Sequence, residues 1–230
     1  KKLFPSLTIL RLDRDSAPND KKHSLIIKTF IEKRAQVLIG TQMIFNQNLP
    51  AVDLSAVLSL DTLLNLPDFL SGEKTWQIIN LLKKISSNRL PIFIQTYNPE
   101  NQILKWVAES NWQEFYQNEI ALRKELNFPP FAQLIKLSFR HRQAKIAAQE
   151  AKFLATKLRQ VNLKNLNVII GETLPAFIPK EGGYYIWQII LKFPLKNIKE
   201  KNSEFLKNRN ALLSYVPENW LIEVDPESLL

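Results

Sequence analysis

Residues 128–131 read FPPF, and this short stretch divides the chain into two parts with different patterns. Two consecutive prolines end a helix, because proline lacks a backbone N–H and pushes the preceding residue toward extended conformations. Residues 101–127 have a mostly helical pattern, whereas a strand-like pattern begins at Gln133. We therefore expect a domain boundary here, with residues 1–128 in the first domain and residues 129–230 in the second.

The first domain alternates short apolar strands with amphipathic helices. Its expected strands are 7–12, 36–39, 54–60 and 91–96, and its expected helices are 25–34 and 71–85. Such alternation is typical of a parallel sheet with both faces covered, so the sequence predicts an α/β domain. On helix 71–85 the side chains expected to face inward are Trp76, Ile79, Leu82 and Ile85.

The second domain has a different order of elements. The pattern predicts strand 133–140, helix 142–161, strands 167–171 and 184–193, helix 197–213 and strand 220–224. This βαββαβ order is the split βαβ or ferredoxin-like arrangement. The sequence therefore predicts a smaller α+β domain after the α/β domain.

Composition narrows the classes of protein that the chain can belong to. Its 230 residues are 45% hydrophobic, enough for a packed core, but no apolar run reaches the ~18–20 residues of a membrane span. Cysteine is absent, which excludes disulfides and cysteine-bound zinc within this chain and suits a reducing cytoplasm. With two histidines, we expect no metal site. The first residue is Lys1, so we expect a piece of a longer protein.

The positive charge of the chain is concentrated in one region. The formal net charge is +9, and residues 132–209 alone hold 15 basic and 5 acidic side chains, a net charge of +10. Such a density indicates a polyanionic partner such as nucleic acid. A solvated, lysine-rich surface explains it equally well. The location of the basic residues must decide between the two.

Residues 40–44 read GTQMI and directly follow an apolar strand. Backbone N–H groups at such a strand end can bind a phosphate, although a plain turn is the commoner explanation of a lone Gly-Thr. Further stretches follow in order: LNLPDF at 64–69, IQTYNPE at 94–100 and FPPF at 128–131. Together these four motifs resemble the second helicase lobe of the primosomal replication-restart helicase family.

The resemblance extends over essentially the whole chain. LRLDRD at 10–15, positions between 171 and 192, and Val224-Asp225-Pro226 also match that family. The resemblance implies a RecA-like helicase lobe followed by a C-terminal domain. It also implies a superfamily 2 DNA helicase that uses ATP and magnesium and restarts stalled replication forks with primosome proteins. The family's Walker lysine, first lobe and zinc cysteines would lie upstream of Lys1.

The chain departs from the family where ATP would be bound. The family's motif Q-x-x-G-R-x-G-R supplies arginines to the ATP phosphates, but Ile85 and Asn88 stand in their places. A positioned arginine can contribute roughly 10³–10⁵ in rate, and lysine lacks its planar fork. We therefore predict a degenerate nucleotide site at Gly40, Thr41 and Gln42, with no catalytic residue and weak or lost ATPase activity. The alternative is an active 3′–5′ helicase that uses other cations.

Helix 142–161 carries a polar, mainly basic stripe opposite an apolar one. The stripe consists of Arg142, Lys145, Gln149, Lys152, Thr156 and Arg159, and the apolar side of Ala147, Ala151, Leu154, Leu158 and Val161. Phosphate contacts need only flexible cations on a surface that follows the backbone. We predict DNA binding by Arg142, Lys145, Lys152 and Arg159, while a solvated face explains the same stripe.

Residues 179–188 read PKEGGYYIWQ, a hairpin turn that leads into a strand. Strand alternation places Tyr184 and Gln188 on one face and Trp187 on the other. Aromatic rings beside a lysine can stack on unpaired bases, so we predict DNA contacts at Lys180 and Trp187.

The family resemblance associates this strand with DNA and with the acidic tail of single-stranded DNA-binding protein. It therefore implies partner contacts at Tyr184, Gln188 and Lys192, although Ile186 replaces a common arginine. We expect the C-terminal part of a protein that binds forked and single-stranded DNA and organises the primosome. A scaffold for single-stranded DNA-binding protein without direct DNA contact is the third possibility.

Overall fold

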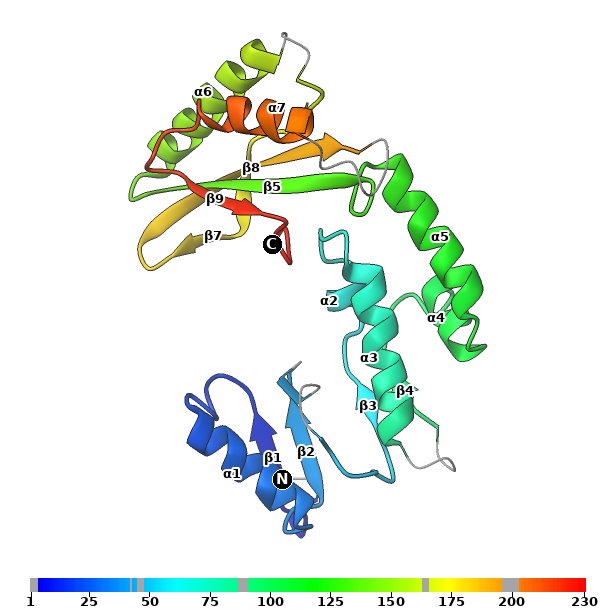
Figure 1. The fold of residues 1–230 in the computed structure, drawn as a ribbon. Helices are drawn as coiled ribbons and strands as arrows, with labels where there is room; N and C mark the ends of the chain where they lie inside the picture. The colour runs from blue at the N-terminus through cyan, green and yellow to red at the C-terminus, as the bar shows by residue number, and fades with distance from the viewer. Residues whose placement is uncertain (1–3, 42, 45–47, 87–90, 163–165, 196–202) are drawn as a thin grey trace. The chain divides into compact units, whose positions relative to one another are not determined.

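The computed structural model describes residues 4–41, 43–44, 48–86, 91–162, 166–195 and 203–230. The chain forms two compact units (Figure 1). Unit 1 comprises Lys1–Leu64 and Lys74–Val107, and unit 2 comprises Asn65–Glu73 and Ala108–Leu230. The segment Asn65–Glu73 therefore belongs to unit 2 although the chain on both sides of it belongs to unit 1, and the later division falls between Val107 and Ala108 rather than at residue 128. The expected domain boundary remains a prediction.

Unit 1 contains two pairs of parallel strands. β1 (Ile9–Leu12) pairs with β2 (Val37–Gly40), and β3 (Ala56–Val57) pairs with β4 (Phe93–Ile94). The helices of this part are α1 (Asp20–Ile31), α2 (Asp61–Leu64), α3 (Ser71–Ile85) and α4 (Gln102–Ala108). The alternation of parallel strands and helices agrees with the predicted α/β class. In the residues that the structure describes, however, the two pairs form separate two-stranded sheets rather than one continuous parallel sheet.

The helices of unit 1 follow the sequence signals only in part. Trp76, Ile79 and Leu82 on α3 are buried as predicted, whereas Ile85 is half-buried. Helix α1 begins five residues earlier than its apolar pattern, because the side chain of Asn19 accepts a hydrogen bond from the Lys22 N–H and caps the helix.

Unit 2 is built on one antiparallel sheet. The strands are β5 (Ala132–His141), β6 (Ile169–Ile170), β7 (Leu174–Glu181), β8 (Tyr184–Pro194) and β9 (Leu221–Val224). The sheet order is β6-β8-β5-β9, and β7 also pairs with β8. The predicted βαββαβ order is present, with β7 as an added strand. Pro175 and Pro179 lie within β7, and prolines argue against a strand when only the sequence is read.

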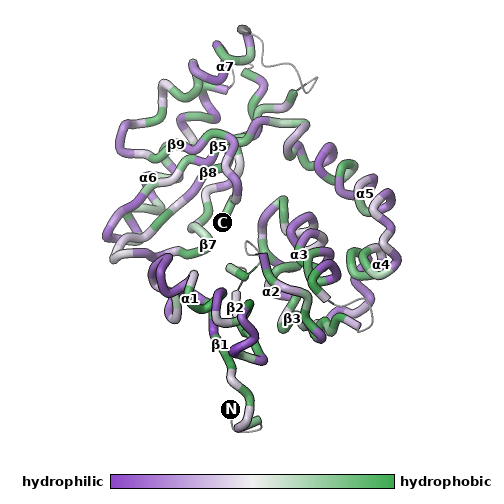
Figure 2. The backbone as a smooth tube through the Cα atoms, turned by 60° about the horizontal axis from the view of Figure 1, so that its bottom comes forward, coloured by the Kyte–Doolittle hydropathy of each residue, from purple (hydrophilic) through white to green (hydrophobic). Residues whose placement is uncertain are grey.

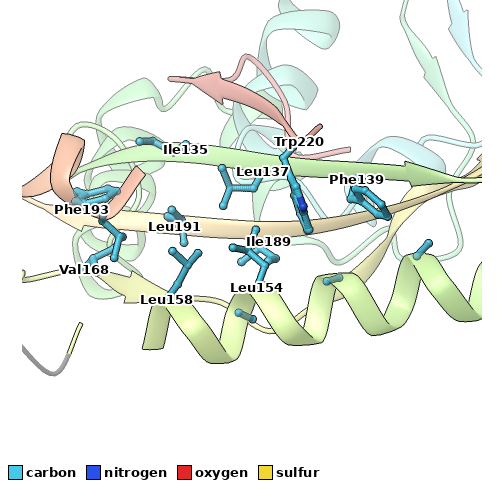
Figure 3. Close-up of a cluster of buried hydrophobic side chains, with 14 residues drawn as sticks. Ile135, Leu137, Phe139, Leu154, Leu158, Val168, Ile189, Leu191, Phe193 and Trp220 are labelled. Carbon is cyan, nitrogen blue, oxygen red and sulfur yellow. The ribbon is translucent and has the colours of Figure 1, made fainter. Parts of the chain in front are cut away.

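The described part of unit 2 also contains the helices α5 (Trp112–Glu125), α6 (Ala144–Asn162) and α7 (Ser203–Leu213). Figure 1 shows α6 and α7 on the same side of the sheet. Figure 3 shows Leu154 and Leu158 of α6 pointing at Leu191 and Ile189 of β8. These side chains belong to one buried apolar cluster, which also contains Leu137, Phe139, Phe193, Leu212 and Trp220.

The alternation of hydropathy along α6 explains its place on the sheet. Figure 2 shows hydrophobic and hydrophilic residues alternating along this helix. The apolar side predicted from the sequence is buried from Ala147 to Leu158, and Val161 is partly buried against the same cluster. Burial of apolar area stabilises a fold by about 25 cal/mol per Å², so the apolar face determines the orientation of α6 about its own axis. The basic stripe of α6 consequently faces solvent.

Candidate nucleic-acid interface

The β7–β8 hairpin ends in a turn that only glycine accommodates easily. Gly182 and Gly183 both have positive φ, 56° and 84°, and connect Glu181 to its partner Tyr184. Positive φ at both central residues is the geometry of a type I′ turn, whose twist matches that of the flanking strands. The turn places Tyr184 and Tyr185 at the first two positions of β8, on opposite faces of the hairpin.

Two arginines converge on the exposed ring of Tyr184. The guanidinium carbon of Arg140 lies 5.9 Å from the ring centroid, and that of Arg142 lies 5.5 Å from it. Arg140 comes from the end of β5, and Arg142 from the connection between β5 and α6. Both distances are within the range of cation–π attraction. Arg140, Gly182 and Tyr184 line a shallow hollow of about 350 Å³. The structure thus joins cations and an aromatic ring from three segments.

Lys180 forms a similar contact on the other face of the hairpin. Its Nζ lies 4.9 Å from the ring centroid of Tyr185. Trp187, which we predicted to contact DNA, is on this same face. Its side chain is partly buried against the apolar cluster of unit 2. Tyr185 is packed against the same cluster, so both rings are partly committed to the core, with Tyr185 nearer the hairpin tip than Trp187.

The predicted basic residues fall into two groups. Arg142 and Lys180 lie at the hairpin, on opposite faces, whereas Lys145, Lys152 and Arg159 lie along the exposed side of α6. Arg159 donates to the Gly171 carbonyl at 3.0 Å and to the Glu172 carboxylate at 3.1 Å. Sequence reasoning missed Arg140 as a member of the first group. The signal for it was its position at the end of a strand, two residues before Arg142.

The sheet face turned away from α6 and α7, called the outer face below, carries alternate residues of the strands. Arg140 on β5 is paired with Ile186 on β8, and Ser138 is paired with Gln188. Tyr184, Ile186 and Gln188 therefore share the outer face, as the alternation predicted. The exposed end of this face is flanked by the Arg140–Glu181 ion pair, with a distance of 3.1 Å between nitrogen and oxygen.

Comparison with known protein families places this geometry in context. Residues 124–227 match a family model described as the primosomal protein N C-terminal domain, and they contain the hairpin, Arg140 and all of α6. The chain belongs to the PriA family of replication restart proteins.

Three relatives illustrate the similarity. The replication restart protein PriA of Chlamydia muridarum is 32% identical over 227 residues, which cover 97% of this chain and 30% of the relative. The PriA protein of Bacillus subtilis is 30% identical, covering 93% of this chain and 28% of the relative. That of Haemophilus influenzae is 28% identical, covering 100% and 32%. The chain thus spans about a third of the length of these PriA proteins.

Lys192, for which the PriA resemblance implied a partner contact, is held within unit 2. Its Nζ donates to the Leu126 carbonyl at 2.7 Å and lies 3.7 Å from the centroid of the Phe128 ring. Phe128 belongs to FPPF and stacks on Phe69 of LNLPDF at 5.3 Å. Burial lowers the pKa of the Lys192 ammonium group. Two PriA-like motifs and Lys192 therefore pack together.

The LNLPDF segment is anchored in unit 2 by polar contacts as well. Ser228 donates to the Asp68 carboxylate at 2.7 Å. Arg123 donates to Glu73 and Glu119, both at 2.8 Å. The side chains of Arg123 and Glu119 are 13% and 17% exposed, so this pair is largely shielded from water, whereas the Glu73 side chain is 36% exposed. Glu73 is thus held in an ion pair within unit 2.

The GTQMI segment, which would hold a nucleotide in the PriA resemblance, is packed closely against β1. The Thr41 N–H donates to the Leu12 carbonyl at 3.2 Å. A Cβ atom added to Gly40 would lie 2.6 Å from the same carbonyl oxygen and 2.6 Å from the Ile44 side chain. Gln42 lies outside the described residues. The glycine is therefore explained by strand packing, and the Thr41 N–H already has an acceptor.

Replacing Gly40 with alanine is expected to lower the free energy of unfolding by about 1–3 kcal/mol, because the added methyl group overpacks a site closed by backbone. Urea unfolding followed by circular dichroism measures this change. Ile39→Val is a suitable control, because Ile39 precedes Gly40 on the same strand and its side chain is exposed. Equal stability of the Gly40→Ala variant and the wild type would show that β1 and β2 are not packed this closely.

The residues that the structure describes are 4–41, 43–44, 48–86, 91–162, 166–195 and 203–230. In those ranges, no group of three or more histidine, cysteine, aspartate or glutamate side chains could hold a metal ion. None of the helices described there is long and apolar enough to cross a bilayer.

Proposed function

We propose that this chain is the DNA-binding C-terminal portion of a replication restart protein, which binds single-stranded and forked DNA and helps to organise the primosome. The observation that carries the proposal is the convergence of Arg140 and Arg142 on the exposed ring of Tyr184. Membership of the PriA family supports the same role.

The chemistry of this convergence suits unpaired nucleic acid. Stacking of a base on an aromatic ring contributes about 1–3 kcal/mol and depends little on which base is stacked. Guanidinium groups beside the ring can pair with phosphate oxygens in a bidentate manner. Several small α+β domains hold single strands on the exposed face of a sheet in this way. Tyr184 would therefore stack on a base while Arg140 and Arg142 contact the flanking phosphates.

We also propose that the outer face accepts an acidic protein tail, such as that of single-stranded DNA-binding protein. Tyr184 and Gln188 lie on this face together with Arg140, and arginine pairs with carboxylates as it does with phosphates. An acidic peptide and single-stranded DNA would then compete. A competition titration in which the peptide leaves DNA binding unchanged would rule out a shared site.

Unit 1 would be the remainder of a RecA-like helicase lobe, with weak or absent ATP hydrolysis. Engagement of the Thr41 N–H by Leu12 supports this, as does the donation of the Lys83 ammonium group to the Val107 carbonyl. Both groups would otherwise be available to phosphate. An ATPase assay on the protein that contains the upstream lobe tests the proposal. Turnover stimulated by forked DNA would overturn it and favour the active helicase.

Fluorescence anisotropy with single-stranded and forked oligonucleotides tests DNA binding by the chain. Arg140, Arg142 and Lys180 are the three cations at the hairpin. If all three contact phosphates, the logarithm of the association constant should fall with the logarithm of the salt concentration at a slope of about −2 or steeper, since a single strand releases about 0.7 counterions per contact. Absence of DNA binding at low salt would favour the alternative that the chain is a scaffold and contacts only proteins.

A further inference from the structure

The β7 strand contains a long bulge of four residues that has no part in the proposed function. Pro175 pairs with Trp187, and Lys180 pairs with Tyr185. Four residues of β7, Ala176 to Pro179, therefore lie opposite the single residue Ile186. The extra residues of a bulge have no partners on the neighbouring strand, and bulges re-aim side chains next to functional sites.

The bulge presents two large apolar side chains to solvent. Phe177 is 55% exposed and Ile178 is 61% exposed, while Ala176, which precedes them, is buried. Pro175 and Pro179 flank the segment Ala176–Ile178, and each proline fixes its own φ near −65° and removes an N–H. The chain around Phe177 and Ile178 is thus stiffened by its covalent structure and anchored by one buried methyl group.

Cations lie further along the same hairpin, toward its tip. Lys180 follows Pro179, and its strand partner Tyr185 is next to Tyr184 and the two arginines. Figure 1 shows β7 and β8 running side by side to the hairpin turn. One hairpin therefore combines a basic tip, which suits a phosphate backbone, with an apolar shoulder formed by Phe177 and Ile178.

We propose that Phe177 and Ile178 form an apolar wedge that contacts the bases at the junction where duplex DNA opens into single strands. The proposal rests on the proposed DNA binding at the hairpin tip. Proteins that kink DNA commonly insert phenylalanine, isoleucine or proline between base steps while cations hold the adjacent phosphates. Unstacking costs a few kcal/mol per step and is cheapest where pairing is already interrupted, as at a junction.

The neighbouring charges favour DNA over a protein as the occupant. The segment 132–209, which contains the hairpin, carries 15 basic and 5 acidic residues. A nucleic acid satisfies this positive charge and provides flat apolar base faces for Phe177 at the same time. The wedge would give the domain a preference for a fork over a plain single strand, because only a fork offers a terminal base pair.

A fork that carries 2-aminopurine at the junction tests the wedge. Its fluorescence is quenched by stacking, so the wild-type chain at saturation should raise it severalfold. The variant F177A/I178A should lose this rise, while its affinity for single-stranded DNA stays within about threefold of wild type, since the contacts of Arg140, Arg142 and Lys180 with phosphates remain. Both side chains are exposed, so the substitutions leave the core intact.

Two further variants sharpen the result. F177L/I178L keeps the apolar volume and should retain most of the fluorescence rise. F153A removes another exposed phenylalanine, on α6, and should leave the rise unchanged. A rise that survives in F177A/I178A, or wild-type binding without any rise, would overturn the wedge but leave DNA binding standing. Failure of the wild-type chain to bind DNA would overturn both proposals.

Discussion

Replacing Arg140, Arg142 and Lys180 together with glutamine is expected to weaken binding of single-stranded DNA about 10- to 100-fold near 0.1 M salt. Each lost phosphate contact lowers the counterion release and flattens the salt dependence by about one unit at most. The three side chains are exposed, so the fold should be retained. Anisotropy titrations at several salt concentrations would show both the weaker affinity and the shallower slope.

The matched control removes the same number of positive charges, three, from the other basic surface. Lys145→Gln, Lys152→Gln and Arg159→Gln alter the exposed side of α6 and leave the hairpin intact. We expect this control to lose less than about threefold in affinity, the effect of a change in overall field alone. Equal losses of affinity in both triple variants would show that the chain binds DNA through its overall positive charge and not at a defined site. A larger loss in the α6 variant would move the interface to that helix.

Replacing Leu158 with alanine is expected to lower the free energy of unfolding by about 2–5 kcal/mol, through lost transfer free energy and the cavity left behind. Leu158 is completely buried between α6 and the sheet, beside Leu191 and Val168 (Figure 3). A loss of this size is a large fraction of the stability of an ordinary domain. Urea unfolding monitored by circular dichroism measures it.

Leu122→Ala is the control for the core prediction. Leu122 is on α5 and half of its side chain is exposed, so the change should stay within about 0.5 kcal/mol, as for most surface substitutions. If Leu158→Ala cost no more than Leu122→Ala, α6 would not pack on the sheet as the structure has it.

Elements with strong periodicity were predictable from the sequence. Helix α6 was predicted at 142–161 and is found at Ala144–Asn162, with its predicted apolar side buried. Its apolar residues recur every three or four positions, and this signal needs no tertiary information. By contrast, β7 was not predicted as a separate strand, because Pro175 and Pro179 mask it and its pairing with β8 is interrupted by the bulge.

The hairpin site depends on strand register, which local patterns do not contain. Arg140 reaches the ring of Tyr184 because β5 pairs with β8 so that His141 is opposite Tyr185. A shift of one residue would turn Arg140 to the opposite face. Lys192 illustrates the same difficulty, since nothing near it in the sequence indicates that it lies over Phe128.

The central claim is that nucleic acid binds at the hairpin, and photo-crosslinking to single-stranded DNA that carries 5-iodouracil tests it most directly. An excited iodouracil couples to an aromatic side chain stacked on it, and mass spectrometry then identifies the residue. Of the exposed aromatic rings, Tyr184 lies at the hairpin, whereas Phe153 lies beside Lys152 on α6. We predict a crosslink in the peptide that contains Tyr184. A crosslink confined to Phe153 would contradict the account.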